Sequence, residues 1–349
     1  MISLVKNNPV QKMCYLPSRW HLLCALAIML LTTLSIGFGP AGWDWRLAFA
    51  WLAPEHFGQF DALQIQVVTQ IRLPRFILAV LVGAVLAQTG AATQALCRNP
   101  LADPSIIGIS AGAAVVAVTF IAFGAQFNFQ AQHYLPYASF MGALTVTYLL
   151  YRIARQHRQI NITTLILVGV AVNALSFALI GLLSFYADDS ALRLINYWTM
   201  GSLAGANWRS LMESTPLLIL SLVGLWSLRE PMNLLLVGES QAQYLGVNTQ
   251  QLKIKIIIFV ALGVGAVVAL TGLIGFVGLV VPHIARLMVG PHLRIMMPLC
   301  IMLGIIVLLL SDWLARVLVM PAELPIGIIT ALLGAPLFIY LILKSKKES

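Results

Sequence analysis

Few residues of this 349-residue chain could take part in chemistry, and they lie far apart in the sequence. His283 and Arg286 are three residues apart, so they share one face of a helix near the end of an apolar run. A metal site at His283 would need a second ligand, and none stands four residues after it. We therefore favour a capping or interface role for His283, and we predict no metal site.

A second group of charges lies near the end of the next apolar run. Asp312 and Arg316 are four residues apart, which predicts an ion pair on one helical face. Charged residues inside a membrane span are functional hypotheses by default. Asp312, Arg316 and Glu323 all stand near an expected span end, however. We therefore expect them to reach the outer surface rather than to form a deep proton relay.

The sequence contains no recognisable catalytic motif. None of the seven lysines follows a glycine, so no G-x-x-x-x-G-K-[ST] loop is present to hold ATP phosphates. The motifs H-E-x-x-H and G-x-S-x-G are also missing. The cysteines form no C-x-x-C pair, which favours free thiols over a disulfide or a metal site. The four cysteines are Cys14, Cys24, Cys97 and Cys300. We predict that the chain is not an enzyme and binds no cofactor, so any uphill transport needs a partner or an ion gradient.

The elements that must position these residues are membrane helices. Mean hydropathy is +0.91 and only 9% of the residues are charged, a composition that no soluble domain has. We predict an all-α polytopic membrane protein with a single transmembrane domain over residues 1–349. The ten expected spans are 20–38, 68–96, 106–124, 135–151, 162–185, 211–228, 254–270, 273–289, 296–311 and 326–343. The fourth and the ninth are shorter than the usual ~20 residues.

The distribution of positive charge predicts the orientation of these spans. Ten spans place both termini on the same side. Of the 21 lysines and arginines, all but six then fall on the side of the termini. The six others are Arg46, Arg72, Arg75, Arg193, Arg209 and Arg316. By the positive-inside rule, both termini are expected in the cytoplasm.

The longest polar interruption is residues 229–255, which we call the polar island. Ser240 and Gln243 match the S-x-x-Q capping box at the start of a short helix. Gly246 stands where such a helix would end in a left-handed residue. Ala242 and Leu245 are three apart and would share a face. A short helix on the cytoplasmic side could dock a soluble partner, and the alternative is an ordinary interfacial loop helix.

Small residues repeat in three expected spans. Gly83, Ala87 and Ala91 recur every fourth residue, a stripe that lets membrane helices approach closely. The third span begins with GISAGAA, which contains Ser110 and Gly112. Gly272, Gly275 and Gly278 recur every third residue, and Pro282 follows them. We expect irregular backbone in this glycine- and proline-containing segment, which at membrane depth must pack on protein or face a water-filled cavity. These small residues either pack helices together or line a pore.

Several of these segments together resemble the FecCD-type permease subunits of bacterial ABC importers for iron-siderophores, haem and vitamin B12. The resemblance covers most of the chain from about residue 65. It is carried by IRLPR at 71–75, RNPLADPSIIGISAGA at 98–113, GESQAQYLGV at 238–247, TGLIGFVGLVVPHIARLMVG at 271–290 and ELPIGIITALLGAPLF at 323–338. The motifs occur in the order of the family.

The resemblance implies the type II importer architecture and a set of partners. Two permease subunits, identical or similar, would surround a translocation path in the bacterial inner membrane. Two cytoplasmic ATPase subunits would bind ATP and Mg²⁺, and a periplasmic binding protein would deliver the cargo.

The resemblance also implies roles for particular residues. Residues Glu239 to Leu245, followed by Gly246, would form the coupling helix that sits in a groove of the ATPase; they include Ser240, Ala242 and Gln243. Arg72, Arg75 and Arg316 resemble residues that receive acidic groups of the binding protein. The alternative is that Arg72 and Arg75 only anchor a helix end. The path would be lined by the small residues Gly83, Ala87, Ala91, Ser110, Gly112, Gly272, Gly275 and Gly278.

The expected cargo is a ferric siderophore or haem, with vitamin B12 as the alternative within the family. An ion-coupled secondary carrier is an alternative from another class, but it would need titratable groups at mid-membrane. A membrane scaffold that transports nothing would leave the proline- and glycine-rich spans without a purpose. The sequence leaves open whether the second permease is an identical copy.

Overall fold

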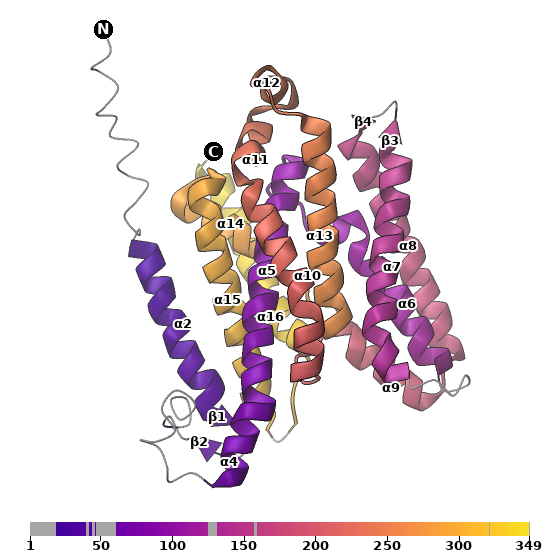
Figure 1. Ribbon diagram of the computed structural model, residues 1–349, viewed down its shortest axis with the longest axis vertical. Helices are drawn as coiled ribbons and strands as arrows, with labels where there is room; N and C mark the ends of the chain where they lie inside the picture. Colours follow the sequence, from indigo (N-terminus) through magenta and orange to yellow (C-terminus); the bar gives the residue numbers. More distant parts are fainter. Residues whose placement is uncertain are drawn as a thin grey trace.

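The computed structural model describes residues 19–39, 42–43, 46, 61–124, 131–156, 159–320 and 322–348. Almost all of them are helical (Figure 1). The helices are α2 (Arg19–Gly37), α4 (Ala62–Val67), η2 (Val68–Arg72), α5 (Leu73–Cys97), η3 (Pro104–Ile107), α6 (Ile109–Phe123), α7 (Ala131–Ala154), α8 (Ile162–Tyr186), α9 (Asp189–Thr199), α10 (Trp208–Ser227), α11 (Arg229–Val237), α12 (Glu239–Tyr244), α13 (Thr249–Thr271), α14 (Val277–Val289), α15 (Leu293–Val317) and α16 (Ile326–Glu348). There are also two short antiparallel strand pairs, β1 (Phe38–Gly39) with β2 (Gly42–Trp43) and β3 (Arg155–Gln156) with β4 (Gln159–Ile160).

Each of the ten expected spans coincides with one helix or one continuous helical segment. Among the described residues, six segments are long and apolar enough to cross a membrane, and three shorter apolar helices lie at 109–123, 277–289 and 326–341. The tenth is α7. The two spans that the sequence suggested to be short are α7 and α15, with 24 and 25 residues, so those expected edges were wrong. Polar residues near the helix ends had been counted as loop.

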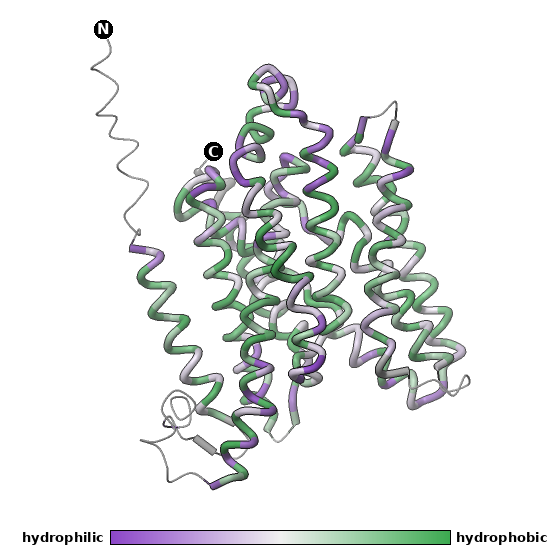
Figure 2. Tube along the Cα trace, in the orientation of Figure 1, coloured by the Kyte–Doolittle hydropathy of each residue, from purple (hydrophilic) through white to green (hydrophobic). Residues whose placement is uncertain are grey.

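The connecting segments gather alternately at the two ends of the bundle (Figure 1). The helix α12 lies at the same end as the β3–β4 turn, whereas α4, β1, β2 and α9 lie at the opposite end. Figure 2 shows hydrophobic residues along the helices and hydrophilic residues concentrated near both ends. This arrangement is the alternation that ten crossings require.

The helix α5 is the centre of the bundle. Of its 25 residues, 19 are buried, and it packs against α10, α13, α14 and α15. The small-residue stripe makes this possible. A Cβ on Gly83 would lie 2.5 Å from the carbonyl oxygen of Gly304, and Ala87 and Ala91 are fully buried. The stripe therefore packs α5 on its neighbours, as small residues do in lipid.

The helices α5 and α14 approach each other very closely where Gly90 meets Gly278. A Cβ on Gly90 would overlap the carbonyl oxygen of Gly278. We therefore expect Gly90→Ala to lower the free energy of unfolding by about 1–3 kcal/mol, because overpacking forces the backbones apart. Thermal unfolding of the purified protein in detergent measures this effect.

The matched control is Gly181→Ala. No atom lies within 4 Å of a Cβ placed on Gly181, in α8, so this substitution only adds helix propensity. Its melting temperature should be unchanged or higher. Equal melting temperatures for the Gly90→Ala variant and the original protein would contradict the packing argument.

The backbone of residues 271–290 is irregular, as expected, and the irregular part lies before Pro282. The helix α14 runs through Pro282, whereas the segment 272–276 between α13 and α14 is not helical. Gly272 and Phe276 have φ values of 70° and 68°, a left-handed region that side chains rarely adopt. The irregular backbone therefore coincides with the start of the glycine repeat, and α14 continues through Pro282.

Candidate functional site

The polar island is mostly helical. The helix α11 covers its first nine residues and α12 the next six, and α13 begins within it at Thr249. The expected capping box is wrong. Gly238 is the N-cap of α12, with a φ of 150°, and Ser240 lies inside the first turn. The side-chain amide of Gln243 instead donates a hydrogen bond to Thr249 Oγ1 at 2.9 Å.

Residues within α12 and just after it differ strongly in burial. Ala242 is fully buried, but the helix ends at Tyr244, so Leu245 is its C-cap and is 65% exposed. The expectation that Ala242 and Leu245 share a face was therefore wrong. Gly246 has a φ of 85°, which confirms the left-handed residue expected there. Sequence reasoning missed Tyr244, which is 91% exposed, although an aromatic residue in a polar segment is itself a signal.

An ion pair attaches α12 to the membrane helix α13. Lys253 Nζ lies 2.7 and 2.8 Å from the two carboxylate oxygens of Glu239, and it also donates to the carbonyl of Ile160 at 3.1 Å. Gln250 Nε2 donates to Glu239 at 3.0 Å. The Lys253 side chain is only 3% exposed. Glu239 therefore holds the short helix on α13, and Lys253 connects this ion pair to Ile160 in β4.

A polar cavity of about 590 Å³ opens beside α12. Its lining combines the two ends of the Glu239–Lys253 pair with Ser240, Gln243 and the first residues of α8. Arg98, at the end of α5, lines it as well. Cationic and hydrogen-bonding groups thus surround a recess next to the exposed tip of the short helix.

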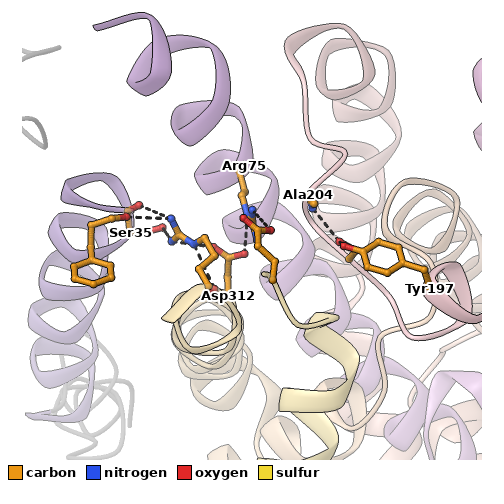
Figure 3. Close-up of polar contacts among 9 residues, drawn as sticks. Ser35, Arg75, Tyr197, Ala204 and Asp312 are labelled. Atoms are coloured by element: carbon orange, nitrogen blue, oxygen red, sulfur yellow. Dashed lines mark hydrogen bonds and ion pairs between the residues drawn. The ribbon is translucent and has the colours of Figure 1, made fainter. Parts of the chain in front are cut away.

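Charged residues form a buried cluster at the opposite end of the bundle (Figure 3). Arg75 in α5 points toward Asp312 in α15, with Nε 2.9 Å from Asp312 Oδ1 and Nη1 2.8 Å from Glu323 Oε2. Arg316 Nη2 lies 3.1 Å from Asp312 Oδ2, close enough for an ion pair although the angle is not that of a hydrogen bond. Arg316 also donates to the carbonyl of Ser35, in α2.

This cluster confirms the Asp312–Arg316 pair and corrects two expectations. Asp312 is 1% exposed and does not reach the surface. Arg316 does not reach the surface either, because it pairs with Asp312 inside the chain, as Arg75 does. Arg72 is buried too, and its Nη1 donates to the carbonyl of Ile36 at 2.6 Å. Nothing in these contacts tests docking of a binding protein, which stays a prediction.

The small residues that were expected to line a path fall into two groups. Ser110, Gly275 and Gly278 line a cavity of about 370 Å³ between α5, α6, α13 and α14. The other five lie against protein atoms: Gly83, Ala87, Ala91, Gly112 and Gly272. Within this single chain, those five serve packing.

His283 and Arg286 contact different helices. The His283 ring meets the edge of Phe338 in α16 at 6.1 Å, and Arg286 Nη2 donates to Gln94 Oε1 at 2.8 Å. Among the described residues, no three His, Cys, Asp or Glu side chains gather as a metal site would require. Of the cysteines, Cys24, Cys97 and Cys300 are free thiols in α2, α5 and α15, and Cys14 lies outside the described residues.

These features define a polytopic helical membrane protein that carries a short surface helix fastened to its core. The family model of the FecCD transport family matches residues 26–344. The chain belongs to this family of membrane transport proteins.

Relatives and one solved structure extend over nearly the whole chain. The hemin transport system permease protein HmuU of Yersinia pestis is 38% identical over 94% of this chain and 97% of its own length. The vitamin B12 import system permease protein BtuC of Vibrio cholerae is 39% identical over 84% of this chain and 87% of its own. A structure described as a metal-chelate type ABC transporter, in an inward-facing conformation, superimposes with a TM-score of 0.82 at 34% identity. The match covers 93% of this chain and 98% of that one.

Proposed function

We propose that this chain is the permease subunit of an ATP-driven importer that moves an iron chelate, a ferric siderophore or haem, across the bacterial inner membrane. The observation that carries the proposal is α12, a short helix fastened to α13 by a buried ion pair and exposing Tyr244 and Leu245. When a soluble partner displaces such a helix, the displacement can be transmitted to the membrane helices. The haem permease HmuU and the metal-chelate transporter support the class of cargo.

The mechanism follows from the contacts of α13. Closure of two ATPase subunits around ATP would displace α12. The Glu239–Lys253 pair would carry that displacement into α13 rather than let α12 move alone. Further along α13, Val264 and Val268 line the cavity of about 370 Å³. A shift of α13 would therefore reshape this cavity and open it to alternate sides.

The assembly would contain a second permease subunit, identical or similar, a cytoplasmic ATPase dimer and a periplasmic binding protein. ATP and Mg²⁺ would bind to the ATPase alone. Both termini would lie in the cytoplasm, on the same side as α12. Acidic groups of the binding protein would meet the end of the bundle that carries Arg72, Arg75 and Arg316. Because these arginines are buried, docking there requires either long-range attraction or rearrangement of the cluster.

Vitamin B12 remains the alternative cargo, because BtuC of Vibrio cholerae is as similar as the haem permease. The ion-coupled carrier is less well supported. The buried acid Asp312 has two arginine partners in α5 and α15, so protonating it would leave an excess of buried positive charge. A carboxylate so paired is a poor proton carrier.

The exposed tip of α12 should be needed for ATPase binding but not for folding. We expect Tyr244→Ala to weaken binding of the ATPase at least about tenfold, because exposed aromatic side chains are common anchors of interfaces. The melting temperature should stay unchanged, since Tyr244 is 91% exposed. Co-purification titrated with ATPase measures the affinity. Tyr186→Ala, at the far end of α8, is the matched control and should bind as before. Equal affinity of the two variants would contradict the prediction.

The whole proposal is tested by uptake into proteoliposomes. Radiolabelled ferric siderophore, haem and cobalamin are supplied in turn to the permease reconstituted with its ATPase. The permease is used intact or with residues 239–245 scrambled. ATP-dependent uptake of one cargo that vanishes with the scrambled segment would support the proposal and name the cargo. Uptake that needs no ATPase and follows an imposed ion gradient would overturn it.

A further inference from the structure

Counted along the helices, the cavity of about 370 Å³ lies about halfway through the expected hydrocarbon core. Two of its lining residues, Leu86 in α5 and Gly278 in α14, each stand eleven residues from the helix end that faces the α12 side of the bundle. At 1.5 Å per residue this is about 16 Å, half of a hydrocarbon core of about 30 Å. The lining is mostly apolar, and its polar side chains are Asp103, Ser105 and Ser110.

Asp103 uses only one of its two carboxylate oxygens for local structure. Oδ1 accepts a hydrogen bond from the Ser105 amide at 2.8 Å and so caps η3, which begins with Pro104. Oδ2 has no hydrogen-bond partner among the described residues. One carboxylate oxygen of Asp103 therefore caps η3, and the other is available to accept a hydrogen bond or to contact a cation.

The glycines of α14 and the segment before it leave this carboxylate uncovered. A Cβ on Gly278 would stand 3.4 Å from Asp103 Oδ2 and 3.0 Å from the ring of Pro104, so any side chain there would cover the acid. At Gly275, a Cβ would meet no atom within 4 Å. The spacing of small residues thus keeps a passage open in front of Asp103.

A carboxylate at this depth needs water or a cation nearby, because an isolated charge in hydrocarbon is costly. The other deep acid, Asp312, has two arginine partners. Asp103 has no lysine or arginine within ion-pair distance among the described residues, since the ion pairs there involve other acids.

We propose that Asp103 lines the water-filled translocation path and is a contact for cationic and hydrogen-bond-donating groups of the cargo. Ser105 and Ser110 supply polar groups in the same cavity. The single negative charge attracts ammonium, amide and hydroxyl groups of a chelate and slows anionic groups. The apolar remainder of the lining binds weakly, so that the cargo is not retained. This inference rests on the proposed importer function for the identity of the cargo, but the charged passage itself is testable without it.

The test compares the access of cations and anions to the cavity. The variant Ser110→Cys is assembled with its ATPase in lipid nanodiscs and treated with methanethiosulfonates bearing either a trimethylammonium or a sulfonate group. Peptide mass spectrometry follows position 110 separately from the native cysteines. After correction for each reagent's reactivity with a free thiol, we expect the cationic reagent to react about tenfold faster, because one charge at short range is weakly screened there.

Adding Asp103→Asn to this variant isolates the charge. Asparagine can still cap η3, so the local fold is retained while the negative charge is removed. The rate ratio should then fall to about one. Asp188→Asn is the matched control, because Asp188 caps α9 in the same way, with its carboxylate accepting from the Ala191 amide at 2.7 Å. That substitution should leave the ratio unchanged.

Two results would overturn the inference: failure of either reagent to modify position 110 with and without ATP, or a rate ratio that Asp103→Asn does not change. Uptake measured on the same preparations separates this inference from the proposed function. Charge-dependent labelling without ATP-driven uptake would support the passage and count against the importer. Uptake with charge-independent labelling would do the opposite.

Discussion

Replacing Asp312 by asparagine is expected to lower the free energy of unfolding by about 3–5 kcal/mol, the usual result of removing one partner of a buried ion pair. Asp312 is 1% exposed and neutralises both Arg75 and Arg316, whose side chains are almost as buried. Asparagine has nearly the same shape but carries no charge. Two guanidinium groups would then remain in a site where, among the residues that the structure describes, Glu323 is the remaining acidic partner.

The control for this prediction is Glu323→Gln. Glu323 also binds Arg75, at 2.8 Å, but its side chain is 30% exposed. Its loss should therefore cost no more than about 1 kcal/mol. Thermal unfolding of both variants in the same detergent gives the comparison. If the two variants melt at the same temperature, the buried Asp312 contributes no more to stability than the partly exposed Glu323, which would contradict the prediction. A second variant, Asp312→Asn with Arg316→Met, should regain part of the loss because one unpaired cation is removed.

Breaking the Glu239–Lys253 pair is expected to uncouple ATP hydrolysis from transport. We expect Glu239→Gln to reduce ATP-driven uptake at least about tenfold while the bound ATPase still hydrolyses ATP. The reason is that Lys253, 3% exposed, would be left with the Ile160 carbonyl and a neutral amide. A buried ammonium without a counter-charge is costly, so α12 and α13 should separate to hydrate it.

The reverse substitution should be milder for stability. In Lys253→Met, the unpaired Glu239 side chain is already 32% exposed and can be hydrated, and methionine fills the volume of the lysine stem. Both variants should lose coupling, but Glu239→Gln should melt at the lower temperature. Uptake and ATP hydrolysis are measured on the same proteoliposomes. Glu230→Gln serves as the control, because Glu230 is exposed and its nearest cations lie 3.7 and 4.0 Å away. Uptake that is normal in Glu239→Gln would show that the pair does not transmit motion.

Local patterns in the sequence were enough to find the helices and several contacts within them. Runs of apolar residues located all ten spans, because a helix that crosses lipid must satisfy its own backbone and present apolar side chains. The Asp312–Arg316 pair was also predictable, since it joins residues one helical turn apart. Helix ends were less certain, as α7 and α15 show, because polar residues continue a helix beyond the hydrocarbon.

Errors arose where a local rule competed with packing. The Ser240 capping box failed because Gly238 could adopt a backbone conformation closed to other residues, which moved the start of α12 two residues earlier. Arg75 was expected to meet acidic groups of a partner, because no acid stands close to it in the sequence. Its two acids are Asp312 and Glu323, which are 237 and 248 positions away from it.

The class of protein, the ten spans, the polar island and the family could all be predicted from the amino-acid sequence, since each depends on composition or on motifs that are continuous along the chain. The packing of the helices was needed to show which small residues pack and which line a cavity, why Glu239 faces α13 rather than a partner, and why Asp103 keeps a free carboxylate oxygen. Each of these depends on which helices become neighbours. Nearly every span of this chain is equally apolar, so hydropathy carries almost no information about which helices become neighbours. Close contacts such as that of Gly90 with Gly278 select the neighbours.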